Sequence, residues 1–233
     1  MKRFLLWIFV KIPLALIALS VLSVAIFKWV PVWYTPLMLK RAIEYHDDKN
    51  YKFSRHWVKI EDISPEMIKC VVASEDNRFN THNGFEWNAI KKEIAKSQKS
   101  GKKPRGCSTI SQQTAKNVFT FGGRSFIRKG VESYFTFLIE KIWGKKRIME
   151  VYLNVFETGK GIYGTDAAAR VWFGTSSKKL TRRQCSLITA CLPSPLKRNP
   201  AKPTNYLNRR SGQIVELVPK IDFRYLKDWY GKD

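Results

Sequence analysis

The sequence predicts a mainly α-helical domain that follows a single transmembrane helix at the N-terminus. From residue 63 onward, helix start signals and helical spacing of apolar residues recur, and we find no sustained array of strands with alternating apolar and polar residues. Residues 4–27 form an apolar run that contains only Lys11 and two serines as polar residues. The length of 233 residues suits one domain of ordinary size plus this appendage.

The apolar run is long enough to cross a membrane. As a helix its 24 residues would extend about 36 Å, against a hydrocarbon core of roughly 30 Å. A cleaved signal peptide is the alternative, but Ser23-Val24-Ala25, which resembles a cleavage triplet, lies inside the run. We therefore assign residues 1–3 to a cytoplasmic tail and 4–30 to an uncleaved anchor, although flanking charges barely decide its orientation.

The rest of the chain divides into a connector and a domain. Prolines and the polar stretch 47–50 mark residues 31–60 as a juxtamembrane connector, and residues 61–233 form the domain. In the domain, Ser64 is placed to cap a helix that begins at Pro65. Further helices are expected over residues 108–119, 125–142, 145–156 and 181–192, whereas 91–105 should be a helix running into a basic, mobile loop.

Charge and cysteine content narrow the function classes. Lysine and arginine total 42 against 19 acidic residues, a formal net charge of +23 that predicts a polyanionic partner: nucleic acid, an anionic membrane or a phosphorylated substrate. The four cysteines form no C-x-x-C pair and the three histidines are scattered, which argues against a zinc site.

The first candidate site is the segment from Glu75 to Glu86. On a helix, Glu75 would share a face with Ile68, Val71, Val72 and Phe79, and burial there would make its carboxylate a better proton acceptor at neutral pH. Asp76 would point about 100° away, toward His82 or a basic group. The alternative is that Glu75 merely ends a helix.

Two further segments carry polar and cationic groups. Ser108 or Thr109 would cap a helix whose next turns present Gln112 with Lys116 and Gln113 with Asn117, suited to sugar hydroxyls and phosphate. Arg124, Arg128 and Lys129 surround Glu132 in sequence and could grip a diphosphate, directly or through a divalent ion. An ordinary polar helix surface and a surface ion pair are the respective alternatives.

Taken together and in order, these segments resemble one known family, the family 51 glycosyltransferases, which are peptidoglycan glycosyltransferases. The resemblance is strongest to its monofunctional members, and it spans roughly residues 65–205. The matching motifs are Glu75-Asp76-x-x-Phe79-x-x-His82-x-Gly84, Gly106-x-Ser108-Thr109-Ile110-x-Gln112-Gln113-x-x-Lys116-Asn117, Arg128-Lys129-x-x-Glu132, Glu150-x-Tyr152-Leu153-Asn154 with the following glycine-rich turn, and Leu192-Pro193-Ser194-Pro195.

This resemblance implies a lysozyme-like domain of two lobes with a cleft between them. It implies a single-pass protein of the cell inner membrane whose catalytic domain faces the periplasm or cell exterior and polymerises glycan chains from lipid II. The substrates would be lipid II and the growing glycan-lipid, at the membrane surface and without nucleic acid. Penicillin-binding and cell-division proteins are candidate partners. No cofactor is obligatory, and Glu132 is a candidate ligand for Mg²⁺ or Mn²⁺.

The resemblance also implies roles for individual residues. Glu75 would be the general base, and Glu132 would hold the metal or organise the neighbouring cations. The remaining motif residues would contact substrate: Asp76, Phe79, His82, Ser108, Thr109, Gln112, Gln113, Lys116, Asn117, Arg124, Arg128 and Lys129. Three positions depart from the usual pattern. Glu86 stands where many members have Asp, Cys107 stands where a small residue is usual, and Val131 stands where many have Lys.

Two rival functions remain open at this point. A lytic transglycosylase or lysozyme-like muramidase could share a helical fold and a single essential glutamate. A membrane-tethered nucleic-acid binder would use the basic loop and the aromatic residues, although no recognition module is present.

Overall fold

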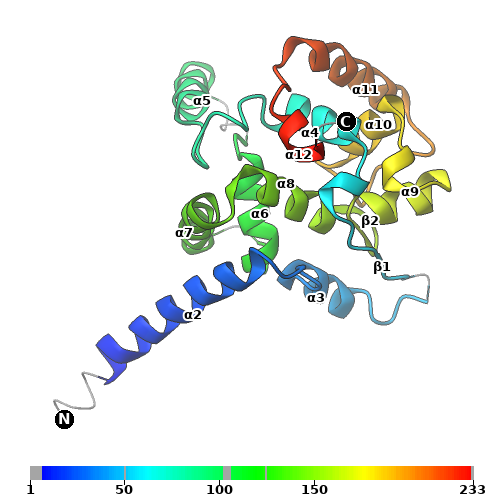
Figure 1. Ribbon diagram of the computed structural model, residues 1–233. Coiled ribbons are helices and arrows are strands. Elements are labelled where there is room, and N and C mark those ends of the chain that lie inside the picture. The colour runs from blue at the N-terminus through cyan, green and yellow to red at the C-terminus, as the bar shows by residue number, and fades with distance from the viewer. Residues whose placement is uncertain (1–6, 50, 102–105, 124, 232–233) are drawn as a thin grey trace.

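The structure, a computed structural model, is mainly α-helical and describes residues 7–49, 51–101, 106–123 and 125–231. The predicted tail 1–3 and Arg124 lie outside the described residues. The helices, labelled as in Figure 1, are α2 (Ile12–Phe27), α3 (Pro36–Glu44), α4 (Pro65–Glu75), α5 (Trp87–Ser100), α6 (Ile110–Phe119), α7 (Phe126–Ile142), α8 (Gly144–Val155), α9 (Thr165–Phe173), α10 (Arg182–Cys191), α11 (Asn205–Leu217) and α12 (Leu226–Tyr230).

The helix start signals of the sequence place most of these boundaries within a residue or two. Thr109 and Thr181 cap α6 and α10, and each forms a reciprocal capping box with the glutamine three residues later. Ser64 occupies the cap position of α4 with Pro65 as the first helical residue, but the Ser64 side chain makes no capping hydrogen bond. Of the two candidate caps for α6, Thr109 rather than Ser108 takes the role.

The segment 31–60, interpreted from the sequence as a connector, contains regular structure that packs on the domain. Helix α3 lies against α6, and β1 (Ser54–Arg55) pairs in parallel with β3 (Ile162–Tyr163). Strand β2 (Glu157–Gly159) pairs with the other side of β3 in antiparallel fashion, which gives the order β1-β3-β2. The sequence missed this sheet because its strands are two or three residues long, too short for an alternating pattern.

The helices form two packed groups that meet at the centre of the molecule. Helices α4, α10 and α11 pack together, and α6, α7 and α8 form the second group (Figure 1). The α4 residues Met67, Ile68, Val71 and Val72 are fully or almost fully buried. The C-terminal end of α4 therefore lies where the two groups meet, next to the start of α6.

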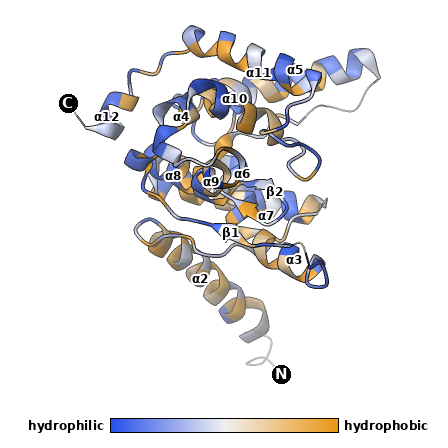
Figure 2. Cartoon of the chain, turned by 90° about the vertical axis from the view of Figure 1, so that its right-hand side faces the viewer, coloured by the Kyte–Doolittle hydropathy of each residue, from blue (hydrophilic) through white to orange (hydrophobic). Residues whose placement is uncertain are grey.

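Helix α2 projects from the body and is mostly apolar along its length (Figure 2). The span Phe9–Phe27 is long and apolar enough to cross a membrane by length and composition, and little of it is buried within the protein. At its C-terminal end the helix is docked on α7 and α8: Trp143 Nε1 donates to the Val24 carbonyl at 2.6 Å, and Arg147 Nη2 donates to the Phe27 carbonyl at 2.8 Å. The anchor is thus joined to the domain by directed hydrogen bonds.

Candidate active site

Glu75 is the last residue of α4, and the helix ends there because Asp76 leaves the helical conformation (φ −161°, ψ 76°). The expectation that Ile68, Val71 and Val72 lie on a buried face of this helix is confirmed. The expectation that Phe79 continues this helical face is wrong, since the helix has already ended. Phe79 is buried all the same, carried inward by the loop after Asp76.

The Glu75 carboxylate is half-buried and hydrogen bonded on both oxygens. Ser74 Oγ donates to Oε1 at 3.0 Å, and Gln113 Nε2 donates to Oε2 at 3.2 Å. Behind Ser74, Arg210 Nη2 of α11 donates to the serine hydroxyl at 3.1 Å. The carboxylate also lines a cavity of about 600 Å³ whose wall includes Arg78 and Arg210. Glu75 therefore combines fixed orientation with access to a ligand.

Gln113 is itself held in place from the far side. The Tyr152 hydroxyl donates to Gln113 Oε1 at 3.2 Å, which leaves the amide nitrogen facing Glu75. Complete burial, reinforced by the charges of Glu75 and Asp76, raises the pKa of Tyr152 far above its ordinary value. Tyr152 therefore stays a neutral donor and fixes the orientation of the amide that touches the carboxylate.

Asp76 and His82 are brought together as expected, but inside the wall of the site. His82 Nε2 lies 3.0 and 2.9 Å from the two Asp76 oxygens, and Gly84 N donates to His82 Nδ1 at 3.0 Å, which leaves the ring proton on Nε2. Asp76 Oδ2 also accepts from Ile110 N at 3.0 Å. This network joins the end of α4 to the start of α6.

Gly84 belongs to the same network, and its backbone packs closely against α7. Its φ of +89° is favourable only for glycine, and a Cβ atom would stand 2.9 Å from Thr136 Cγ2. The Gly84 carbonyl accepts from Thr109 Oγ1 at 2.6 Å. Thr109 and Gln112 are both buried, and Gln112 Oε1 accepts from Thr109 N at 3.1 Å. These two residues thus build the start of α6, whereas Gln113 is the glutamine that contacts Glu75.

Lys116, the cation of this site, lies on α6 about one turn after Gln113. Lys116 is half-buried and lines, with Gln113, Asn117 and Tyr152, a second cavity of about 290 Å³. Burial lowers the pKa of Lys116, while the charge of Glu132 opposes that shift and Arg128 adds to it. Gln113 connects the acid to the cation, because it donates to Glu75 and also lines the cavity that contains Lys116.

Helix α7 supplies the remaining charges beside Lys116. Glu132 is buried, with 2% of its surface exposed, and forms ion pairs with Arg128 (2.6 Å) and with Lys129. The spacing of i+4 and i+3 predicted from the sequence is thus confirmed. Lys129 also lines a smaller cavity together with Ser108 and Gln112.

The donor set does not fit a metal centre built by protein side chains. Among the described residues, no group of three or more His, Cys, Asp or Glu side chains could hold a metal ion. Glu132 is a single carboxylate, and its two oxygens contact Arg128 and Lys129. A divalent ion here would need most of its ligands from substrate oxygens.

Three residues of the site were not among the sequence-predicted contacts. Tyr152 appeared in a matching family motif without a role of its own, and neither Ser74 nor Arg210 was singled out. For Arg210 no sequence signal exists, because it reaches Glu75 only through the packing of α11 on α4. The sequence could have indicated a role for Tyr152, because a hydroxyl on a buried helix face needs a hydrogen-bond partner.

Comparison with known proteins identifies the family. A model of the transglycosylase family matches residues 42–218. The chain is 49% identical to a biosynthetic peptidoglycan transglycosylase of Bacteroides thetaiotaomicron over 208 residues, which cover 88% of this chain and 84% of that protein. It is 44% identical to the protein of the same name from Shewanella oneidensis over 222 residues, covering 94% of this chain and 93% of the relative. On this match, which spans the site and both helix groups, the chain belongs to the transglycosylase family.

Proposed function

We propose that the protein polymerises the glycan chains of peptidoglycan from lipid II and so acts in cell wall synthesis. Family membership and the names of the relatives support this reaction class. The observation that carries the proposal is the joining of Glu75 to Lys116 through α6: Gln113 holds the acid, and the cation follows three residues later. A proton acceptor beside a cationic end suits attack by a hydroxyl with departure of a diphosphate.

In the proposed step Glu75 takes the proton of the 4-hydroxyl on the N-acetylglucosamine of lipid II. The oxygen forms a bond to C1 of the N-acetylmuramic acid at the lipid end of the growing chain. The bond from C1 to the diphosphate oxygen breaks with inversion, and undecaprenyl diphosphate leaves with the electron pair. No covalent intermediate between sugar and enzyme is required.

The cations stabilise the charge that grows on the departing diphosphate. Lys116 is half-buried, where electrostatic interactions are stronger than in water, and Arg128 lies on the neighbouring helix. Arg124 is assigned the same role from its motif alone. Glu132 does not line the cavities that contain Glu75 and Lys116. Its role in this proposal is to position Arg128 and Lys129 through its ion pairs.

Asp76, His82 and Thr109 are positioning residues in this account, because their side chains are already paired inside the wall, whereas Gln112 pairs through Oε1 and also lines the small cavity with Ser108. Phe79 packs in the core. Ser108, Gln113 and Asn117 line cavities and remain the proposed contacts to sugar or phosphate.

The exposed apolar side chains near α2 support action at a membrane surface. Trp29 is 79% exposed, Phe126 97% and Ile127 83%, an unfavourable arrangement in water but a favourable one in an interface of lipid headgroups. We propose that the protein is anchored in the cell inner membrane with its domain outside the cytoplasm, where penicillin-binding and cell-division proteins are candidate neighbours.

A polymerisation assay separates this function from that of a lytic enzyme. The purified full-length protein in detergent is given lipid II or intact sacculi. We expect glycan polymer from lipid II, inhibition by moenomycin and no soluble muropeptides from sacculi. Cleavage of sacculi with no polymer from lipid II would establish the lytic alternative instead.

A further inference from the structure

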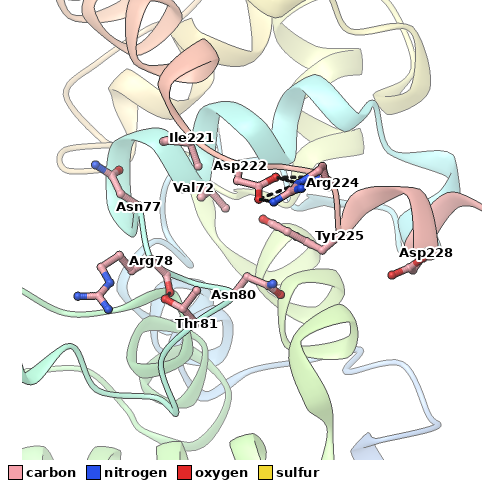
Figure 3. A pocket seen from close by; sticks show the side chains of 10 residues that line it. All are labelled: Val72, Asn77, Arg78, Asn80, Thr81, Ile221, Asp222, Arg224, Tyr225 and Asp228. Carbon is pink, nitrogen blue, oxygen red and sulfur yellow. Dashed lines mark hydrogen bonds and ion pairs between the residues drawn. The ribbon is translucent and has the colours of Figure 1, made fainter.

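A further cavity, lined by polar side chains, adjoins the loop that follows Glu75. It has a volume of about 570 Å³, within the range of ligand sites in proteins. One wall is the loop after α4 and the other is the C-terminal segment that leads into α12 (Figure 3). Its lining residues are Val72, Asn77, Arg78, Asn80, Thr81, Ile221, Asp222, Arg224, Tyr225 and Asp228.

This cavity adjoins the cavity that contains Glu75. Asn77 and Arg78 line both, so the two cavities are neighbours at the loop that follows α4. The Asn77 amide fits best with its nitrogen donating to the Ala73 and Val72 carbonyls, at 2.8 and 3.1 Å. Its oxygen is then left as an acceptor at the junction.

The hydrogen-bonding groups of the cavity are not all satisfied by the protein. The Tyr225 hydroxyl is buried and has no hydrogen-bond partner among the described residues. In Figure 3 it points into the space between the loop and the C-terminal segment. A buried hydroxyl without a partner costs free energy, so this one marks a place where a further polar group is expected.

Opposite charges stand at the two ends of the cavity. Asp222 and Arg224 neutralise each other through hydrogen bonds of 2.6–3.0 Å. At one end the Arg78 side chain, 60% exposed, forms an ion pair with Glu86 through Nε at 3.4 Å, and the Asp228 carboxylate stands at the other end (Figure 3). Val72 and Ile221 add apolar side chains to the lining.

We propose that this cavity binds the peptide branch of the substrate. The inference rests on the proposed function, because lipid II carries a peptide on the sugar that must lie near Glu75. This cavity is a neighbour of the one that contains Glu75, so it is placed for a branch of a molecule bound there. The peptide carries carboxylates and, on its diamino residue, a free amino group. Arg78 is placed for a carboxylate and Asp228 for the amino group, and Asn80, Thr81 and Tyr225 are placed for peptide amides.

The test compares two substrates and two variants of the full-length protein. The substrates are lipid II with the free amino group and lipid II with that group acetylated. For the unmodified protein we expect kcat/KM to be three- to tenfold higher with the free amine, the range of one ordinary hydrogen bond, because Asp228 is exposed. In Asp228→Asn the ratio should fall to about one. Tyr225→Phe should lower kcat/KM for both substrates about threefold without lowering the melting temperature, since the lost hydroxyl had no partner.

Matched controls remove the same groups elsewhere. Asp47→Asn changes the charge equally at an exposed site, and Tyr206→Phe removes a hydroxyl from an exposed tyrosine of α11. The inference is overturned if the unmodified protein does not distinguish the substrates, if Asp228→Asn keeps the ratio, or if Asp47→Asn abolishes it equally.

A binding experiment separates this inference from the proposed function. Soluble N-acetylmuramoyl-pentapeptide is titrated into the protein and followed by saturation-transfer NMR. Binding that Asp228→Asn weakens, in a protein that makes no polymer, would retain the peptide site and reject the polymerase. Polymer formation with no binding that depends on Asp228 would retain the polymerase and reject the peptide site.

Discussion

Removing the Tyr152 hydroxyl should reduce turnover, because that hydroxyl orients the Gln113 amide that contacts Glu75. Tyr152→Phe deletes the donor to Gln113 Oε1, a contact of 3.2 Å made by a side chain that is 1% exposed. The Gln113 amide then loses the restraint that keeps its nitrogen toward Glu75. A hydrogen bond of this kind contributes about 1 kcal/mol, so kcat/KM for lipid II should fall about fivefold.

The stability effect of the same change can be separated from its effect on the site. For a chain of this length, about 1 kcal/mol corresponds to a melting temperature lower by about 2–4 °C. Tyr230→Phe is the matched control, because it also deletes one hydroxyl that donates at 2.8 Å, there to the Ile63 carbonyl. We expect both variants to melt earlier and only Tyr152→Phe to lose activity. Unchanged kcat/KM in Tyr152→Phe, or an equal loss in Tyr230→Phe, would refute the orienting role.

Two further predictions concern the cation and the anchor. Burial lowers the pKa of Lys116 from its usual 10.5, so its ammonium loses its proton at lower pH than a solvated lysine and activity should decline on the alkaline side. Lys116→Arg should move that decline to higher pH in a pH profile of kcat/KM, and an unmoved limb would remove Lys116 from this role. Trp143→Phe deletes the 2.6 Å hydrogen bond to Val24 and part of a buried ring, and should cost about 1–3 kcal/mol in thermal unfolding in detergent. Trp87→Phe, at a tryptophan that is 62% exposed, should cost almost nothing, and equal losses would contradict a docked anchor.

The sequence predicts the helices of this fold well because their signals are local. Thr109 and Thr181 each precede a helix whose N-terminal N–H groups they cap, and the structure confirms both; Ser125 caps α7 in the same way. The ion pairs of Glu132 follow equally from helical spacing. The small sheet is different: β1 finds its partner more than 100 residues away, a pairing that no local pattern encodes.

Within the site, the sequence predicts which residues gather but not which way each one faces. Gln112 and Gln113 are adjacent and chemically identical, so composition cannot say that one caps a helix while the other holds Glu75. Asp76 and His82 lie together as the sequence predicts, but their side chains bond to each other in the buried wall of the site. Arg210 reaches the site only through tertiary packing.

Replacing Glu75 with glutamine tests the central claim most directly. Glu75→Gln keeps the size of the side chain but removes its capacity to take a proton. We predict that lipid II polymerisation falls by at least about 100-fold, the usual contribution of a general base, while the melting temperature stays unchanged. Glu216→Gln, at an exposed position of α11, should polymerise normally. Glycan polymer formed by Glu75→Gln at the rate of the unmodified protein would contradict the account.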